Sequence, residues 1–179
     1  MAGMKAGETS VVPAPPILVG GLVALAVALV ATSGLAAQLA PKPPAFQHVT
    51  VVGSASHAAV AKGGTVTLLA DVTPRAGVHV YAVNAHGFTP VKLVLTPNAY
   101  ITPGRVTLPP AELAPTLGVS EPVPAYRKTF RIAQPVTIAA SAVSGETLRI
   151  AGAVNYQACD DRLCYPAASV PIAWSVAIR

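Results

Sequence analysis

The sequence carries little charge and contains no dense basic cluster. Only 11 % of its 179 residues are charged, and the net charge of +5 is spread along the chain. A nucleic-acid-binding surface needs a denser basic patch, so we expect no nucleic-acid partner. The sequence also shows no glycine-rich phosphate loop, no Ser/His/Asp set and no paired carboxylates. It therefore offers no motif for phosphoryl transfer or for triad hydrolysis.

Long helical patterns and internal repeats are also absent after residue 40. The 18 prolines are scattered along the chain, and prolines break helices and keep strands short. The sequence instead predicts an all-β domain, with residues 97–125 forming loops around short strands. The clearer strands are expected at residues 48–52, 64–73, 77–81, 91–95, 126–132, 135–140, 148–156 and 170–178.

The last two of these strands show the clearest alternation of apolar and polar residues. Val170, Ile172, Trp174, Val176 and Ile178 share one face at a period of two residues. Such alternation predicts that one face packs on a core while the other meets water. Seven to nine short strands with frequent turns are typical of a β-sandwich, and we expect Ile172 and Trp174 in its core.

The N-terminal segment predicts the compartment. Residues 9–41 contain no charge, and residues 17–31 (ILVGGLVALAVALVA) are nearly all apolar. Residues 1–40 are therefore expected to be either a signal peptide or an uncleaved hydrophobic helix, in which residues 17–40 anchor the chain in the inner membrane. Both alternatives place the remainder on the periplasmic side, where disulfides form. Residues 41–46 (PKPPAF) read as a stiff linker before a domain at 47–179.

The only two cysteines, Cys159 and Cys164, lie between the last two predicted strands in the string YQACDDRLCYP. In a hairpin, both thiols lie near its tip and can reach each other. The pair is a weak stabiliser, because closing a loop of about six residues gains roughly 2 kcal/mol, against about 4.7 kcal/mol for a hundred residues. A short pair at a turn is better placed to open and close. This favours redox chemistry, with a structural staple and metal binding as the alternatives.

The string around the two cysteines resembles the cysteine loop of the N-terminal domain of the thiol:disulfide interchange protein DsbD family. Other segments fit in the same order. Residues 77–81 (GVHVY) resemble that family's strand ending in a tyrosine beside the active site. Residues 87–90 (GFTP), Tyr126 and residues 135–138 (PVTI) resemble its middle portion. The resemblance covers about residues 47–178.

The resemblance implies an immunoglobulin-like fold with the cysteine pair on a hairpin. Domains of this kind receive electrons from a membrane-embedded or thioredoxin-like module and reduce extracytoplasmic redox proteins. By the same resemblance, Cys164 forms the mixed disulfide with partners and Cys159 resolves it. Full-length members continue into a multi-span membrane domain and a thioredoxin-like domain. This sequence stops at Arg179, so we expect a thioredoxin-like or DsbD-type membrane redox protein to act in trans.

Family members also shield their cysteines with a cap loop that carries an aromatic residue. The matching stretch here, roughly residues 117–125, contains no aromatic residue. The cap is therefore not transferred to this chain.

The residues that flank the cysteines are candidates for the active-site surroundings. Asp160 and Asp161 either disfavour a nearby thiolate, because like charges repel, or simply suit a turn. Tyr165 adjoins Cys164 and is a candidate for a wall of the site or a partner contact. Pro166 offers no backbone donor, which is expected to leave the sulfur of Cys164 approachable.

Two further tyrosines and the cysteine strand complete the candidate site. Tyr81 and Tyr156 either line the disulfide or pack as ordinary strand residues, and Tyr156 falls on the apolar face of its strand. We expect Cys159 to end the strand that starts at Leu148 and to be held by it.

The four histidines do not adjoin the cysteines in the sequence, although His79 comes near them if the strand match holds. Copper or zinc needs three or four convergent ligands, which the sequence does not show, so we expect no metal and no other cofactor. The leading interpretation is a protein-disulfide oxidoreductase component. The alternatives are a non-catalytic immunoglobulin-like interaction domain with a structural disulfide, and a copper-binding module.

Overall fold

The computed structural model describes residues 47–116 and 118–179. The described residues contain strands but no helix. This part of the chain therefore contains no helix long and apolar enough to cross a membrane. The expected hydrophobic segment at 1–40 and the linker at 41–46 lie outside the described residues. The strands are β1 (Val49–Ala55), β2 (Ala59–Val60), β3 (Thr65–Pro74), β4 (His79–Tyr81), β5 (Lys92–Leu95), β6 (Ile101–Pro103), β7 (Glu112–Ala114), β8 (Val123–Tyr126), β9 (Phe130–Ile138), β10 (Thr147–Tyr156), β11 (Ala158–Cys159) and β12 (Ala168–Ile178).

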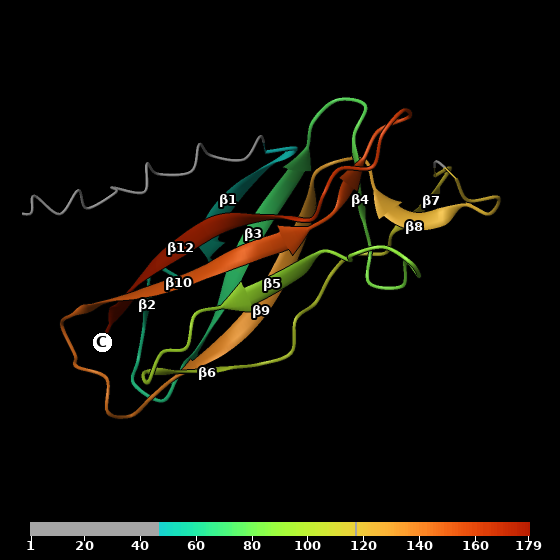
Figure 1. The fold of residues 1–179 in the computed structure, drawn as a ribbon. Helices are drawn as coiled ribbons and strands as arrows, with labels where there is room; N and C mark the ends of the chain where they lie inside the picture. The colour runs from blue at the N-terminus through green and yellow to red at the C-terminus, as the bar shows by residue number, and fades with distance from the viewer. Residues whose placement is uncertain (1–46, 117) are drawn as a thin grey trace, which may run out of the picture. The chain divides into compact units, whose positions relative to one another are not determined.

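The described strands form three four-stranded sheets. The first sheet has the order β1-β3-β9-β6, and the second has the order β2-β12-β10-β5. These two sheets lie face to face as a sandwich (Figure 1). The third, which we call the end sheet, has the order β11-β4-β8-β7 and lies beyond one end of the sandwich. The all-β sandwich that the sequence predicted is confirmed.

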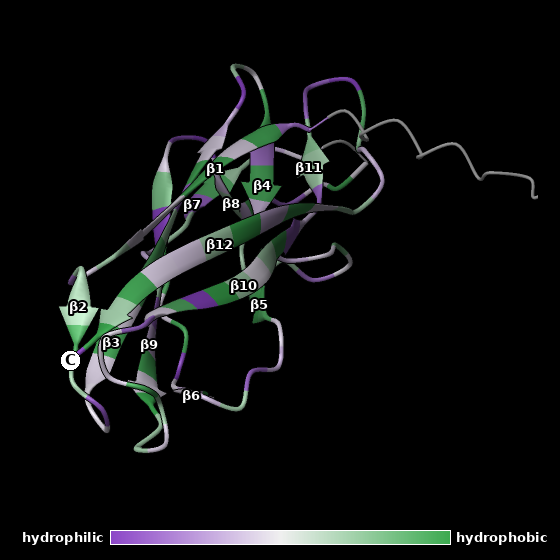
Figure 2. Cartoon of the chain, turned by 90° about the vertical axis from the view of Figure 1, so that its left-hand side faces the viewer, coloured by the Kyte–Doolittle hydropathy of each residue, from purple (hydrophilic) through white to green (hydrophobic). Residues whose placement is uncertain are grey.

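The core follows the alternation seen in the sequence. The five residues that form the predicted apolar face of β12 are all buried, and Ile172 and Trp174 are only 9 % and 3 % exposed, as predicted. Figure 2 shows the corresponding alternation of hydrophobic and polar segments along β12 and β10. The indole N–H of Trp174 donates to the carbonyl oxygen of Leu69 in β3 at 2.9 Å, which links the second sheet to the first. A Cβ at Gly152 would lie 2.7 Å from the Val94 carbonyl oxygen and 3.3 Å from the Trp174 ring, so glycine allows the close approach of β5 beside the indole.

The strand boundaries between residues 126 and 140 differ from the prediction. Tyr126 belongs to β8, and the expected pair of strands at 126–132 and 135–140 is instead one strand, β9, that runs through Pro135. The N–H of Gly104 donates to the Pro135 carbonyl oxygen at 2.7 Å, and Ala133 exchanges two hydrogen bonds with Thr107. The missing N–H of Pro135 therefore faces this irregular neighbouring segment and not the ladder with β3, so β9 continues without losing a bond to β3.

Candidate functional site

The two cysteines lie where the sandwich meets the end sheet. β10 pairs with β12 as far as Tyr156, and the chain then enters the end sheet, where β11 pairs antiparallel with β4. Cys159 thus belongs to β11, opposite His79, and the prediction that it ends the strand from Leu148 is wrong. The change of sheet explains the error, because it depends on β4, which the local pattern does not contain. Cys159 and Cys164 form a disulfide across a five-residue separation.

The two sulfur-bearing residues differ in exposure. Cys159 is 0 % exposed, whereas Cys164 is partly exposed. Both pack in a small apolar cluster that is separate from the sandwich core. A reagent from solvent therefore meets Cys164 before Cys159.

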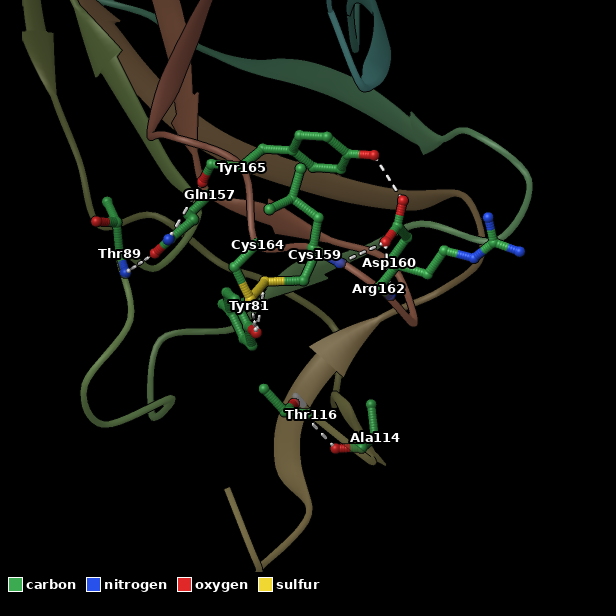
Figure 3. The surroundings of a disulfide bond; sticks show 11 residues. Tyr81, Thr89, Ala114, Thr116, Gln157, Cys159, Asp160, Arg162, Cys164 and Tyr165 are labelled. Atoms are coloured by element: carbon green, nitrogen blue, oxygen red, sulfur yellow. Dashed lines mark hydrogen bonds between the residues drawn. A yellow bond between two sulfur atoms is a disulfide. The ribbon is translucent and has the colours of Figure 1, made fainter. Parts of the chain in front are cut away.

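Tyr81 lies directly against the disulfide (Figure 3). Its hydroxyl donates a hydrogen bond to Cys159 Sγ at 2.9 Å and lies 3.6 Å from Cys164 Sγ. On its other side the ring stacks on Phe88, with 4.0 Å between ring centroids. Burial raises the pKa of Tyr81, and a hydrogen bond with Thr116 opposes this. The phenol therefore stays protonated at neutral pH and remains a donor to sulfur.

Asp160 organises the turn between the cysteines. Its Oδ1 accepts the backbone N–H groups of Arg162 and Leu163, both at 2.8 Å, and its Oδ2 accepts the Tyr165 hydroxyl. The bond from Tyr165 and then the two backbone donors lower the pKa of Asp160. Asp160 therefore stabilises the turn through its hydrogen bonds, which was one of the two alternatives that the sequence offered for it. Asp161, by contrast, is exposed.

Tyr165 closes this turn from the Cys164 side. Its ring stacks on His48 with 3.7 Å between centroids, and its hydroxyl pKa is raised by the bond to the Asp160 carboxylate. Tyr156 is 1 % exposed, and its hydroxyl accepts the backbone N–H of His48 at 3.1 Å. Tyr156 is thus a core residue that anchors the segment beneath Tyr165. Pro166 is exposed.

His79 lies beside the buried cysteine. It is the register partner of Cys159, is 2 % exposed, and meets the Tyr81 ring edge-on at 5.3 Å. Its Nε2 has no hydrogen-bond partner. Burial and then the Arg127 charge lower the His79 pKa, while Asp161 and Asp160 act in the opposite direction. The imidazole is therefore held neutral at pH 7.

Sequence reasoning missed three residues that support the site. Gln157 bonds to both Thr89 and Tyr165, Phe88 stacks on Tyr81, and His48 stacks on Tyr165. Gln157 and Phe88 both lie inside strings that carried the family resemblance, so their positions were a usable signal. His48 gave none, because its partner is more than a hundred residues away.

Within residues 47–116 and 118–179 no three His, Cys, Asp or Glu side chains converge in a way that could hold a metal ion. The copper-binding alternative therefore gains no support from the geometry described.

Together these observations define an all-β domain with one disulfide where the sandwich meets the end sheet. The hydroxyl of Tyr81 donates a hydrogen bond to one of the two sulfurs. The family model described as "Thiol:disulfide interchange protein DsbD, N-terminal" matches residues 47–172. The chain belongs to this family, as the sequence resemblance indicated. A search of curated proteins finds no match.

The solved structures that are similar to this chain include two N-terminal domains. One is the DsbD N-terminal domain of Neisseria meningitidis in its reduced form, with 14 % identity and a TM-score of 0.42, covering 62 % of this chain and 75 % of that one. The other is the N-terminal periplasmic domain of ScsB from Proteus mirabilis, with 16 % identity and a TM-score of 0.48. That match covers 72 % of this chain and 47 % of the ScsB chain.

Proposed function

We propose that this domain is an extracytoplasmic thiol–disulfide exchange module that passes electrons from a membrane or thioredoxin-like donor to envelope redox proteins. The observation that carries the proposal is the disulfide itself. It joins the only two cysteines of a DsbD N-terminal family member, with one sulfur-bearing residue buried and the other partly exposed. The N-terminal segment at 17–40, if uncleaved, holds the domain at the inner membrane.

The loading half of the reaction reduces the disulfide. A donor thiolate attacks Cys164 Sγ, the Cys159–Cys164 bond breaks, and Cys159 leaves as a thiolate that takes up a proton. The donor's second thiolate then attacks its own mixed-disulfide sulfur and releases Cys164. Two electrons have passed to this domain, its two thiols take their protons from solvent, and the donor has become a disulfide.

The unloading half runs the same chemistry toward the acceptor. The Cys164 thiolate attacks an acceptor disulfide, and the departing acceptor sulfur takes up a proton. Cys159 then attacks Cys164 Sγ, re-forms the internal disulfide and releases the second acceptor thiolate. The exposure difference supports this order, since the partly exposed residue has to meet the partner and the buried one has only to reach Cys164.

Trapping on a thioredoxin tests the assignment of the two sulfurs. The acceptor is a thioredoxin that keeps only its attacking cysteine, activated as a mixed disulfide with thionitrobenzoate. The Cys159→Ala chain should displace yellow thionitrobenzoate and form a covalent complex that dithiothreitol dissolves. The Cys164→Ala chain should form little complex. Trapping through Cys159 alone would reverse the roles, and no complex with either variant would favour a structural disulfide.

A further inference from the structure

The side chain of Gln157 joins two segments that the sequence keeps far apart. Its Oε1 accepts the backbone N–H of Thr89 at 2.9 Å, and its Nε2 donates to the carbonyl oxygen of Tyr165 at 3.2 Å (Figure 3). Thr89 immediately follows Phe88, and Tyr165 immediately follows Cys164. One amide therefore connects the loop that carries Phe88 to the segment that carries the partly exposed cysteine.

The Phe88 loop in turn lies against the group that contacts sulfur. Phe88 stacks on Tyr81 at 4.0 Å with an interplanar angle of 17°. The Tyr81 hydroxyl reaches both sulfurs, and Phe88 and Cys164 pack on the same apolar cluster. Phe88 is half-buried and Thr89 is exposed, so the loop has solvent on its outer side. Besides the bond to Gln157, the 83–90 loop has short-range backbone bonds within itself, such as Phe88 N–H to the Ala85 carbonyl.

We propose that Gln157 is a positioning residue of the redox site, which holds Phe88 on Tyr81 and thereby keeps the Tyr81 hydroxyl on the disulfide and limits access to Cys164. The redox role of Gln157 rests on the proposed function, whereas the contacts that position the loop lie within this chain. The Gln157 side chain bonds to Thr89 and Tyr165 and to neither sulfur, so it acts through the Phe88 loop and the segment next to Cys164.

The direct test measures how fast a small reductant opens the disulfide. Tris(2-carboxyethyl)phosphine attacks one sulfur and breaks the S–S bond; water then supplies the oxygen of the phosphine oxide, and two thiols are left. Quenching with an alkylating reagent and weighing the full chain by mass spectrometry gives the rate. Gln157→Ala should react about tenfold faster than the unmodified chain, because the variant loses both hydrogen bonds that connect the loop to the Cys164 segment.

Two further variants, Gln134→Ala and Gln157→Glu, distinguish a specific effect on the redox site from a general loss of stability. Gln134 in β9 is buried and likewise donates through Nε2 to a backbone carbonyl, that of Gly104 at 3.1 Å, away from the cysteines. Gln134→Ala is the matched control and should leave the rate unchanged. Gln157→Glu keeps an acceptor for Thr89 but, when ionised, has no donor for Tyr165. At pH 8 it should resemble Gln157→Ala. Near pH 3.5, where a carboxyl with the ordinary Glu pKa of about 4.3 is mostly protonated, the rate relative to the unmodified chain should return to the slow value.

A spectroscopic readout reports on Tyr81 itself. Burial raises the Tyr81 pKa, so loosening the loop should let one tyrosine ionise at lower pH in an ultraviolet titration of Gln157→Ala but not of Gln134→Ala. Unchanged rate and titration in Gln157→Ala would overturn the inference. If Gln157→Ala does not fold, the absence of any pH-dependent difference for Gln157→Glu would overturn it equally. Because no partner is present, this result is independent of the trapping experiment: failure of one leaves the other standing.

Discussion

Replacing Tyr81 with Phe removes a single oxygen from the site. The phenyl ring retains the stacking on Phe88 and the edge contact with His79, while the hydroxyl that donates to Cys159 Sγ at 2.9 Å is lost. In the reduced protein this hydroxyl is expected to donate to the Cys159 thiolate more strongly than to the thiol, because a charged acceptor makes the stronger hydrogen bond. Its removal should therefore raise the pKa of the Cys159 thiol.

The size of the effect follows from the strength of that bond. Hydrogen bonds to charged groups contribute about 1.5–3 kcal/mol, and sulfur is a weak acceptor, so we take the lower end. At 1.36 kcal/mol per pKa unit the Cys159 pKa should rise by about one unit. Where the thiolate predominates, the same energy makes the disulfide harder to reduce and lowers the reduction potential by about 30 mV.

The assay uses the Cys164→Ala background, in which Cys159 is the sole thiol. Thiolate absorbance near 240 nm against pH gives its pKa with and without the Tyr81 hydroxyl. Tyr126→Phe is the matched control, because Tyr126 also stacks on a phenylalanine, Phe130, at 4.0 Å but donates to the Pro109 carbonyl oxygen and not to sulfur. Tyr126→Phe should leave the thiol pKa unchanged. Identical thiol pKa values with and without the Tyr81 hydroxyl would refute the reasoning.

The other predictions concern the fold and the turn. Trp174→Ala should lower the free energy of unfolding by about 3–5 kcal/mol, because it leaves a cavity in the core and removes a hydrogen bond between the sheets. The control Val52→Ala, at an exposed position, should change that free energy by less than about 0.5 kcal/mol. Urea unfolding of both variants measures the difference, and equal stabilities would contradict the placement of Trp174 in the core. Asp160→Asn should destabilise the protein at pH 7 and have less effect at pH 2.5. Because the pKa of Asp160 is lowered in the folded protein, its carboxylate stabilises the fold above a pH of about 4, and this stabilisation is lost as the pH falls through the lowered pKa. Urea unfolding measures it, and an equal difference in urea midpoint between the two proteins at pH 7 and pH 2.5 would contradict the argument.

The sequence alone was sufficient for the fold class and for the cysteine pair. Alternation along 170–178 is a local property, and it predicted the buried face of β12 residue by residue. The strand pattern predicted the sandwich. The cysteine string indicated the family because its residues are adjacent in the chain. The predicted division into strands at 126–132 and 135–140 was wrong, because whether a strand runs through Pro135 depends on which neighbour faces its missing N–H.

Only the tertiary structure decided how the two sulfurs differ. Cys159 is buried because the chain leaves the second sheet after β10 and β11 then pairs with β4, and the hydroxyl that contacts Cys159 comes from Tyr81, 78 residues earlier. The links through Gln157 to Thr89 and through Tyr165 to His48 are likewise long-range. Periodicity reports which face of a strand is apolar, but it does not report which strand comes to lie beside it. The reactive chemistry of a disulfide depends on those neighbours, since they set its exposure and its hydrogen bonds.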